Sequence, residues 1–181
     1  MPSHKGAEDG MGPLRELLAV DERRTLEFFV TGLKDVCEPD VDVDELLYNA
    51  SVLAHFALVS TESTTDWPAP ASLGTIFDQF VQEPDMFATG SVMEEAGAQC
   101  LLMSGFFENQ MRGRHNVRWY SELGTSFFLR AAARSHSLQR ARFLGSLAMH
   151  FEPWRRRHAR LSRELRQTPF LLTLPNPKTL M

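Results

Sequence analysis

The chain has 181 residues, enough to bury one hydrophobic core, and its 43% hydrophobic and 23% charged residues are typical of a globular protein. Its longest uncharged run in a helix-like segment, residues 96–107, has 12 residues, whereas a membrane-spanning helix needs about 20. The amino end lacks the pattern of a secretion signal, and the cysteines, Cys37 and Cys100, are too few for a disulfide framework. We therefore expect a cytoplasmic protein that does not enter the membrane.

The net charge of −4 is unevenly distributed along the chain. Residues 1–111 hold 5 Lys and Arg against 20 Asp and Glu, whereas residues 112–166 hold 13 Arg against 3 Glu. Segregation on this scale has three explanations, which are nucleic-acid binding, an acidic partner, and attraction between two halves of one fold.

Apolar residues in the first third of the chain recur at helical spacing. Steps of three and four residues predict a helix from Asp21 to Cys37, which Pro39 ends. The following "DVDVDEL" places acidic residues at the start of the next helix, where they suit the helix dipole. Residues 45–60 are apolar nearly all round, which predicts a central helix.

The remaining elements also follow the helical period. After a loop rich in Ser, Thr and Pro, helices are predicted over residues 75–81, 91–109, 117–134 and 138–151. No strand pattern of period two lasts more than a few residues. The expected fold is all-α, a single compact domain of six or seven helices over residues 13–168. We expect a disordered tail over residues 1–12 and an extended apolar arm over residues 169–181.

An arginine-rich segment follows Pro153. Six arginines occupy twelve positions: Arg155, Arg156, Arg157, Arg160, Arg163 and Arg166. At about 100° per residue, the apolar-side residues form a stripe roughly 60° wide (Trp154, His158, Leu161 and Leu165), and the arginines spread over the rest. This distribution favours a solvated face on a docked helix. Contact with the acidic first half, an acidic partner and nucleic acid are the alternatives, and the pI of 5.9 disfavours nucleic acid.

The histidines share no metal-ligand spacing, and no Glu-x-x-His pair occurs, so we expect no metal and no cofactor. His55 lies on the predicted central helix near Tyr48, and we expect it to be buried with a perturbed titration. A pocket between helices 91–109 and 117–134, rimmed by His115, Tyr120 and Glu122, is the candidate small-molecule site.

No catalytic residue is assigned from the sequence. The chain lacks a Gly-x-Ser-x-Gly elbow, a phosphate-binding glycine loop and a dinucleotide fingerprint. Cys100 lies in an apolar setting that keeps a thiol protonated. Arg130 and His136 have a spacing that resembles helical HEPN-type ribonucleases, but Ala131 stands where that family usually has a polar residue, and composition alone gives roughly 1.6 such pairs by chance.

Two neighbouring stretches carry a further resemblance. "AGAQCLLMSGFFENQM" and "VRWYSELGTSFFLRAA" contain Ser104 to Phe107 and then Tyr120, Leu123 and Gly124. This pattern is similar to that of an uncharacterised group of small helical bacterial proteins, and the resemblance implies a helical fold without an activity. From the residues themselves, we expect Gly105 and Gly124 to let these two helices approach closely.

The last residues predict a docking arm. Pro169, Pro175 and Pro177 prevent a helix, while four apolar side chains would be costly to leave in water: Phe170, Leu171, Leu172 and Leu174. Burying them is worth about 6 to 12 kcal/mol before the ordering entropy is subtracted. We expect the arm to lie in a groove of its own domain or of a second copy, the latter giving a symmetric homodimer.

Together these patterns favour a non-enzymatic helical interaction or regulatory module that binds a protein partner or itself. Nucleic-acid binding through the arginine-rich helix is the second hypothesis, and a HEPN-like ribonuclease is the third.

Overall fold

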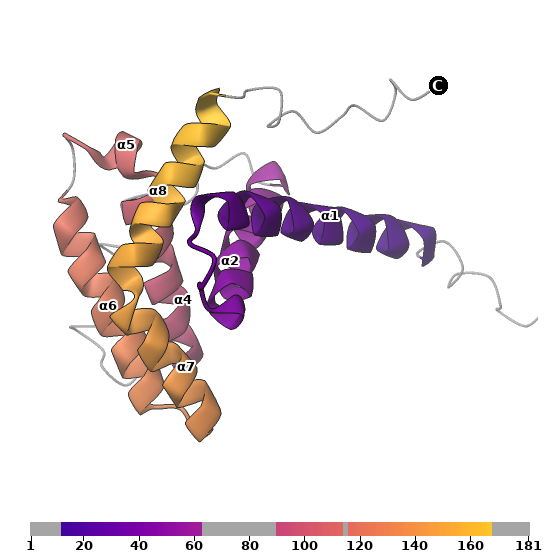
Figure 1. Cartoon of the computed structure of the whole chain (residues 1–181). Coiled ribbons are helices and arrows are strands. Elements are labelled where there is room, and N and C mark those ends of the chain that lie inside the picture. The colour runs from indigo at the N-terminus through magenta and orange to yellow at the C-terminus, as the bar shows by residue number, and fades with distance from the viewer. Residues whose placement is uncertain (1–11, 63–89, 114–115, 168–181) are drawn as a thin grey trace, which may run out of the picture.

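The computed structural model describes residues 12–62, 90–113 and 116–167 (Figure 1). Across these residues the chain forms seven α-helices and one π-helical segment, without strands, so the predicted all-α fold is confirmed. The predicted helix 75–81, the amino tail up to residue 11 and the carboxy-terminal arm lie outside the described residues.

Two helices make up the first part of the fold. Helix α1 (Gly12–Val36) begins nine residues before the predicted start and ends one residue before the predicted end. Helix α2 spans Val43–Glu62. Asp42 caps it, because the Glu45 amide donates to Asp42 Oδ1 at 2.9 Å. The acidic residues before α2 therefore do stabilise its start, as the sequence indicates.

The second part contains the remaining elements, which are α4 (Gly90–Leu101), η1 (Leu102–Phe106), α5 (Glu108–Met111), α6 (Val117–Ala133), α7 (Leu138–Met149) and α8 (Phe151–Gln167). Helix α4 packs on α6, α6 on α7, and α8 on η1, while α1 packs on α2 and on α8. Figure 1 shows α1 crossing the upper end of α2, with its amino-terminal half pointing away from the other helices.

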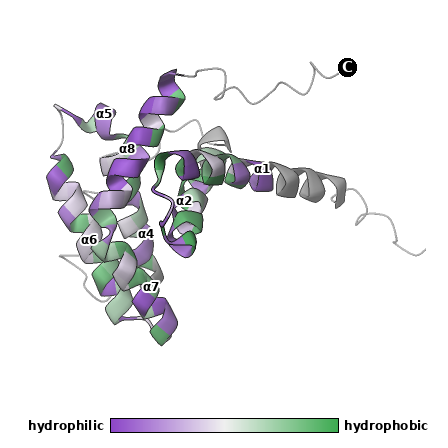
Figure 2. Cartoon of the chain, in the orientation of Figure 1, coloured by the Kyte–Doolittle hydropathy of each residue, from purple (hydrophilic) through white to green (hydrophobic). Residues whose placement is uncertain are grey.

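The core is centred on α8 and its neighbours rather than on α2. Its largest fully buried side chains include Trp154 and Phe151 of α8 and Phe127 and Phe128 of α6. The expectation that residues 45–60 form the central helix is wrong, because α2 leaves Leu47 45% exposed and His55 exposed. Figure 2 shows that α8 is largely hydrophilic along its length, so the central position of this helix is not visible in its composition.

The predicted helix over residues 91–109 is interrupted by η1. Within η1 the Phe107 amide donates to the Leu102 carbonyl at 3.0 Å, which is the i to i−5 bond of a π-helix. At Gly105 a Cβ would lie 2.9 Å from both the Arg155 carbonyl oxygen and His158 Cβ. Gly105 therefore makes room for α8, and not for α6 as the sequence suggested.

Gly124, unlike Gly105, lies where α4 and α6 approach each other closely, as the sequence predicts. A Cβ at this position would lie 2.8 Å from Cys100 Cβ of α4 and would overlap the ring of Phe151. The close approach of α4 and α6 thus depends on Gly124, and the aromatic ring of Phe151 fills the remaining space.

Candidate functional site

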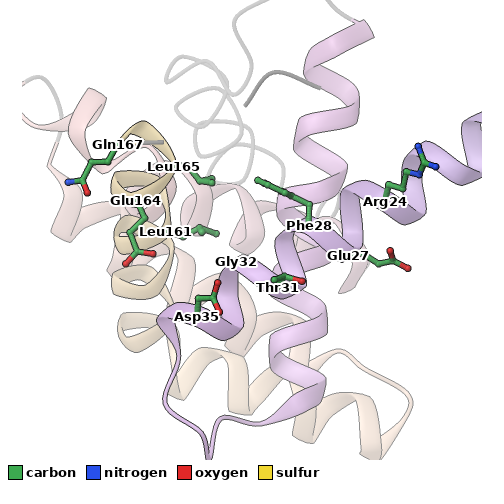
Figure 3. Close-up of a pocket in the computed structure, with 10 residues that line it drawn as sticks. All are labelled: Arg24, Glu27, Phe28, Thr31, Gly32, Asp35, Leu161, Glu164, Leu165 and Gln167. Carbon is green, nitrogen blue, oxygen red and sulfur yellow. The ribbon is translucent and has the colours of Figure 1, made fainter. Parts of the chain in front are cut away.

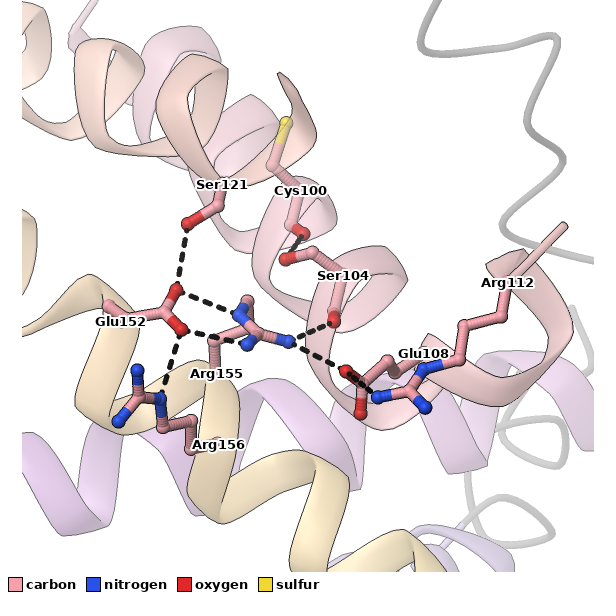
Figure 4. A network of polar contacts seen from close by, with 8 residues as sticks. All are labelled: Cys100, Ser104, Glu108, Arg112, Ser121, Glu152, Arg155 and Arg156. Atoms are coloured by element: carbon pink, nitrogen blue, oxygen red, sulfur yellow. Dashed lines mark hydrogen bonds and ion pairs between the residues drawn. The ribbon is translucent and has the colours of Figure 1, made fainter. Parts of the chain in front are cut away.

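Arg155 is the most enclosed arginine of α8, with a side chain 13% exposed. Its guanidinium makes two parallel contacts with Glu152, from Nε to Oε2 at 2.8 Å and from Nη2 to Oε1 at 2.7 Å. Nη1 donates to the Ser104 carbonyl at 3.1 Å and to Glu108 Oε1 at 3.2 Å (Figure 4). Arg112 also binds Glu108, at 3.0 Å. Arg155 therefore joins α8 to η1 and α5.

The charges of this cluster lower the pKa values of its carboxyl groups. The hydrogen bond from Arg155 is the main cause that lowers the pKa of Glu152 to about 2, against an opposing effect of burial. Burial also acts to raise the pKa of Glu108, but hydrogen bonds from Arg112 and Arg155 outweigh it and hold the pKa below its ordinary value. Both carboxylates are charged at neutral pH and serve to hold Arg155 in place.

Arg157 makes the second ionic contact between α8 and the acidic first half of the chain. Its Nη2 lies 2.8 Å from Glu38 Oε2, and its guanidinium carbon lies 4.6 Å from the centre of the Trp154 ring. The hydrogen bond from Arg157 lowers the pKa of Glu38. Attraction between the two halves of the fold, one of the alternatives left open by the sequence, is therefore realised at Arg155 and Arg157.

The other arginines follow the solvated-face interpretation. Arg156, Arg160 and Arg163 are exposed. Arg156 pairs with Glu152 at 3.1 Å and Arg160 with Glu164 at 3.2 Å, both within α8. These three positions are spaced at i, i+4 and i+7, so they share one side of the helix. Exposed Arg166 donates to Gln110 and Ser162.

A small hollow lies beside this side of α8. It has a volume of about 280 Å³ and is lined by Val36, Glu38, Pro153, Arg156, Arg157 and Arg160. Each of its arginines already has a carboxylate partner, namely Glu152, Glu38 or Glu164. Its positive charge is therefore largely compensated by the protein itself.

Glu45 is the centre of a second polar network, and its residue is 2% exposed. Its Oε1 accepts from Ser146 Oγ at 2.5 Å and contacts His150 Nδ1 at 2.9 Å, while Oε2 accepts from Trp154 Nε1 at 2.6 Å. Burial acts to raise the pKa of Glu45, but the three hydrogen bonds outweigh it and hold the pKa below its ordinary value. Glu45 is therefore a buried carboxylate with its acceptors in use.

Asn49 continues this network one helical turn further along α2. Its Nδ2 donates to the Glu45 carbonyl at 2.8 Å, and its Oδ1 lies 2.8 Å from His158 Nε2. His158 is fully buried, and burial lowers its pKa to about 3. The ring is therefore neutral at pH 7, and Nε2 carries the proton because Asn49 Oδ1 can only accept. His158 Nδ1 has no hydrogen-bond partner in the described part of the chain.

Ser146, His150 and Glu45 are the residue types of a hydrolase triad, but their arrangement does not match one. In a triad the acid and the nucleophile contact opposite nitrogens of the histidine. Here Ser146 Oγ lies 3.4 Å from His150 Nδ1, the same nitrogen that contacts Glu45, and Ser146 donates to Glu45 directly. The network consequently holds α2 against α7 and α8 and does not activate the serine.

Sequence reasoning missed this network. The signal that could have found it is a run of four residues spaced four apart, from α7 through its C-cap His150 into α8: Ser146, His150, Trp154 and His158. Glu45 and Asn49 have the same spacing on α2, so two matched rows of polar groups face each other. The sequence interpretation assigned the acidic residues before and within α2 only to the helix dipole.

The predicted Tyr48 and His55 site is only partly reproduced. Tyr48 packs edge-on against Phe128 and Phe143, with ring centres 6.2 and 5.6 Å apart. Burial is the main cause that raises the pKa of Tyr48, and the charge of Glu94 adds to it. His55 is exposed, so the prediction of a buried histidine at this position is wrong. His158 of α8 takes the buried role instead.

The predicted pocket near Tyr120 is not assembled from its described members. Tyr120 is buried, packs edge-on against Trp119 at 4.8 Å, and has a pKa raised mainly by burial. Glu122 is exposed and pairs with Arg118 at 2.9 Å. His115 lies outside the described residues, so its part in the pocket stays a prediction.

The structure places the HEPN-like pair, Arg130 and His136, and also Cys100. Arg130 is exposed in the last turn of α6, and His136 is exposed in the connection to α7. Neither residue lines the hollow or the groove described here. Cys100 is buried, and burial raises its pKa to about 12, which keeps the thiol protonated as expected.

A larger groove lies between α1 and the end of α8 (Figure 3). It has a volume of about 700 Å³ and is open to solvent. The two helices touch where a Cβ on Gly32 would lie 2.9 Å from Leu161 Cδ1. Beyond this contact, Phe28 and Leu165 point toward each other across the groove (Figure 3).

The groove combines an apolar floor with a charged rim. The floor consists of Phe28, Gly32, Leu161 and Leu165, and the remaining lining residues are Arg24, Glu27, Thr31, Asp35, Glu164 and Gln167. Three carboxylates and one guanidinium give the rim a net negative charge. Such a surface suits a segment with apolar side chains at its centre and basic groups at its edges.

Comparison of the chain with protein families, with curated proteins and with solved structures gives no match. Among residues 12–62, 90–113 and 116–167, no three His, Cys, Asp or Glu side chains gather as metal ligands would. None of the helices in this described part is both long and apolar enough to cross a bilayer. The function has therefore to be inferred from the chain's own residues and their geometry.

Proposed function

We propose that this chain is a helical protein-interaction module that holds a short apolar segment in the groove between α1 and α8. The observation that carries the proposal is the groove itself, in which Phe28 and Leu165 face each other above the contact of Gly32 with Leu161. Leu161 and Leu165 are already buried, whereas Phe28 is only partly buried, so a further apolar group in the groove would remove the remaining contact of Phe28 with water.

The size and openness of the groove favour a protein segment over a small molecule. Its volume of about 700 Å³ lies within the range of roughly 300 to 1,000 Å³ found for ligand sites. A small molecule, however, needs enclosure on most sides, whereas an open groove suits a helix or strand laid along it. The acidic rim favours a segment flanked by Lys or Arg.

A photo-crosslinking residue introduced at Thr31 tests the proposal in the full chain. Thr31 is exposed and lines the groove, and Lys34 is exposed on the same helix without lining it. We expect the Thr31 probe, and not the Lys34 probe, to link to a protein segment with several apolar residues and a basic flank. A synthetic peptide of that segment should then bind the full chain, and Thr31→Trp should weaken binding at least tenfold while Lys34→Trp leaves it unchanged.

Two results would contradict this proposal. One is equal crosslinking from Thr31 and Lys34, which would mean that the groove has no preferred occupant. The other is a crosslinked segment whose synthetic peptide binds Thr31→Trp as tightly as the unaltered chain.

The free thiols of Cys37 and Cys100 support the cytoplasm as the proposed compartment of the module.

A second candidate function is nucleic-acid binding through the exposed side of α8. The observation that favours it is the shared helical side of Arg156, Arg160 and Arg163, of which Arg156 and Arg160 pair with carboxylates of the same helix. Binding of this kind must weaken steeply with salt. Retention on DNA or RNA at low salt that is lost in Arg156→Gln/Arg160→Gln/Arg163→Gln would support it, and absence of retention at low salt would exclude it.

A further inference from the structure

We infer that the carboxy-terminal arm, together with Thr168 before it (residues 168–181), occupies the α1–α8 groove of its own chain and that a partner must displace it. Displacement of the arm by a partner rests on the proposed function, whereas occupation of the groove by the arm does not. Three features connect the arm with the groove: the position where α8 ends, the length of the groove and the composition of the arm.

The end of α8 places the arm at the groove. Gln167 is the last residue of α8 and is itself one of the groove residues, together with Leu165 and Glu164. Phe170 follows three residues later, so an extended chain carries it at most about 11 Å from Gln167. The first apolar residue of the arm is therefore within reach of the groove floor.

The length of the groove matches the apolar part of the arm. The groove follows α1 from Arg24 to Asp35, which is about 16 Å at a helical rise of 1.5 Å per residue. Residues 168–174 span at most about 23 Å when extended. They contain every one of the four apolar residues assigned to the arm from the sequence (Phe170, Leu171, Leu172 and Leu174).

The composition of the arm also matches the groove. Pro169, Pro175 and Pro177 disfavour a helix, and an extended segment can be laid along a helix pair without one. The arm contains Lys178 and no Asp or Glu, whereas the groove rim has three carboxylates against one guanidinium. Apolar groups thus meet the apolar floor, and the side-chain charge of the arm, which is that of Lys178, is opposite to the net charge of the rim.

The position of Gln167 favours the chain's own groove over that of a second copy. A segment tethered a few residues from its site has an effective concentration in the millimolar range. A second copy reaches this concentration only in very concentrated solution. The arm therefore competes with any partner segment of similar composition, which makes it an autoinhibitory element of the groove.

A full-length chain with Phe170→Ser, Leu171→Ser, Leu172→Ser and Leu174→Ser, called the arm variant, tests the inference. The probe is a fluorescent synthetic peptide of residues 168–181, and binding is measured by anisotropy. We expect the arm variant to bind the peptide at least tenfold more tightly than the unaltered chain, whose groove is already filled. A control chain with Thr173→Ser, Asn176→Ser and Thr179→Ser should bind as weakly as the unaltered chain.

The site of binding is checked on α1 and does not depend on the arm variant alone. Thr31→Trp, added to the arm variant, should abolish peptide binding, and Lys34→Trp should leave it intact. In the unaltered full chain, a crosslinking residue at Thr31 should link to residues 168–181 at the mass of a monomer. The same residue at Lys34 should give no such link.

Four results would overturn the inference. The first is a folded arm variant that does not bind the peptide, and the second is equal binding to the arm variant and the unaltered chain. The third is a Thr31 crosslink to residues 168–181 found only at the mass of a dimer, which would place the arm on a second copy. A Thr31 crosslink to a different protein with no link to the arm would leave the proposed function standing and remove this inference.

Discussion

Arg155 of α8 donates through Nη1 to the backbone carbonyl of Ser104 in η1, at 3.1 Å. The contact gives a partner to a carbonyl in the segment where the α-helical hydrogen-bond pattern is interrupted. The neighbouring Gly105 allows α8 to approach closely enough for it. The interruption of the helix and the arginine of α8 are therefore parts of one packing arrangement.

Replacement of Arg155 should destabilise the fold. Arg155→Met removes the enclosed partner of Glu152 and Glu108, which keep only the exposed Arg156 and Arg112 as cationic partners, and it removes the side-chain donor to the Ser104 carbonyl. Loss of one partner from an enclosed ion cluster costs about 3 kcal/mol of unfolding free energy. Arg156→Met is the matched control, because Arg156 is exposed, and exposed ion pairs contribute less than about 1 kcal/mol. Urea unfolding of both variants measures the difference, and equal costs would contradict the role given to Arg155.

Alanine substitutions at two glycines should change the stability of the fold in opposite directions. Gly124→Ala places a Cβ against Phe151 and Cys100, and overpacking of this kind costs about 1 to 3 kcal/mol. Gly145→Ala meets no atom within 4 Å and lies within α7. There the gain in helix propensity should stabilise the chain by up to about 1 kcal/mol. Thermal unfolding should therefore shift downward for Gly124→Ala and upward for Gly145→Ala.

The buried His158 should make stability depend on pH. Its pKa is about 3 in the folded chain, below the ordinary value of about 6.5 that it regains on unfolding. The unfolded chain therefore binds more protons between these values, and stability falls as pH falls through that window. When the pH is lowered from 7 to 5.5, this group reduces the free energy of unfolding by about 1 kcal/mol.

His158→Met isolates the effect of this histidine. The variant should lose less stability between pH 7 and pH 5.5 than the unaltered chain, by about 1 kcal/mol in urea unfolding. The lowered pKa values of Glu45, Glu108 and Glu152 also make stability fall as the pH falls, but they do so mainly below pH 4.5, the ordinary carboxyl pKa. The same pH dependence in both proteins would show that His158 does not remain neutral in the fold.

Substitution of Glu45 should separate its charge from its shape. Glu45→Gln keeps the side-chain volume but places an NH₂ group among donors from Ser146, His150 and Trp154. At least one buried donor then lacks an acceptor, which costs about 1 to 3 kcal/mol. Glu122→Gln, at an exposed position, should change stability by less than about 0.5 kcal/mol. Denaturation at pH 7 compares the free energies of unfolding of the two variants. An unchanged value for Glu45→Gln would mean that the network does not stabilise the fold.

The fold class and one helical face could be predicted from sequence because both depend on local spacing. The stripe of Trp154, His158, Leu161 and Leu165 is buried as its period indicates. The position of α2 could not be predicted, because a helix that is apolar nearly all round does not indicate which side is covered. For the same reason the burial of His55 was predicted wrongly.

The candidate site depended on information that the local pattern lacks. The partners of Glu45 lie 101 to 109 positions away along the chain, so their pairing has no local signature. The arginines of α8 divide between enclosed and solvated positions for the same reason, since Glu38 lies in the connection between α1 and α2 and Glu108 lies in α5. The groove likewise arises only where α1 and α8 meet.

The pairing of Asn49 with His158 has a consequence during synthesis of the protein. The two residues are 109 positions apart, which at translation rates of roughly 5 to 20 residues per second corresponds to about 5 to 20 seconds. During that interval α2 has left the ribosome before its polar partners exist, while α4, α6 and α7 can already pack with neighbours close in sequence. We therefore expect the amino-terminal helix pair to join the rest of the fold last, because a nascent chain that stalls before α8 lacks Trp154 and His158, the α8 partners of Glu45 and Asn49.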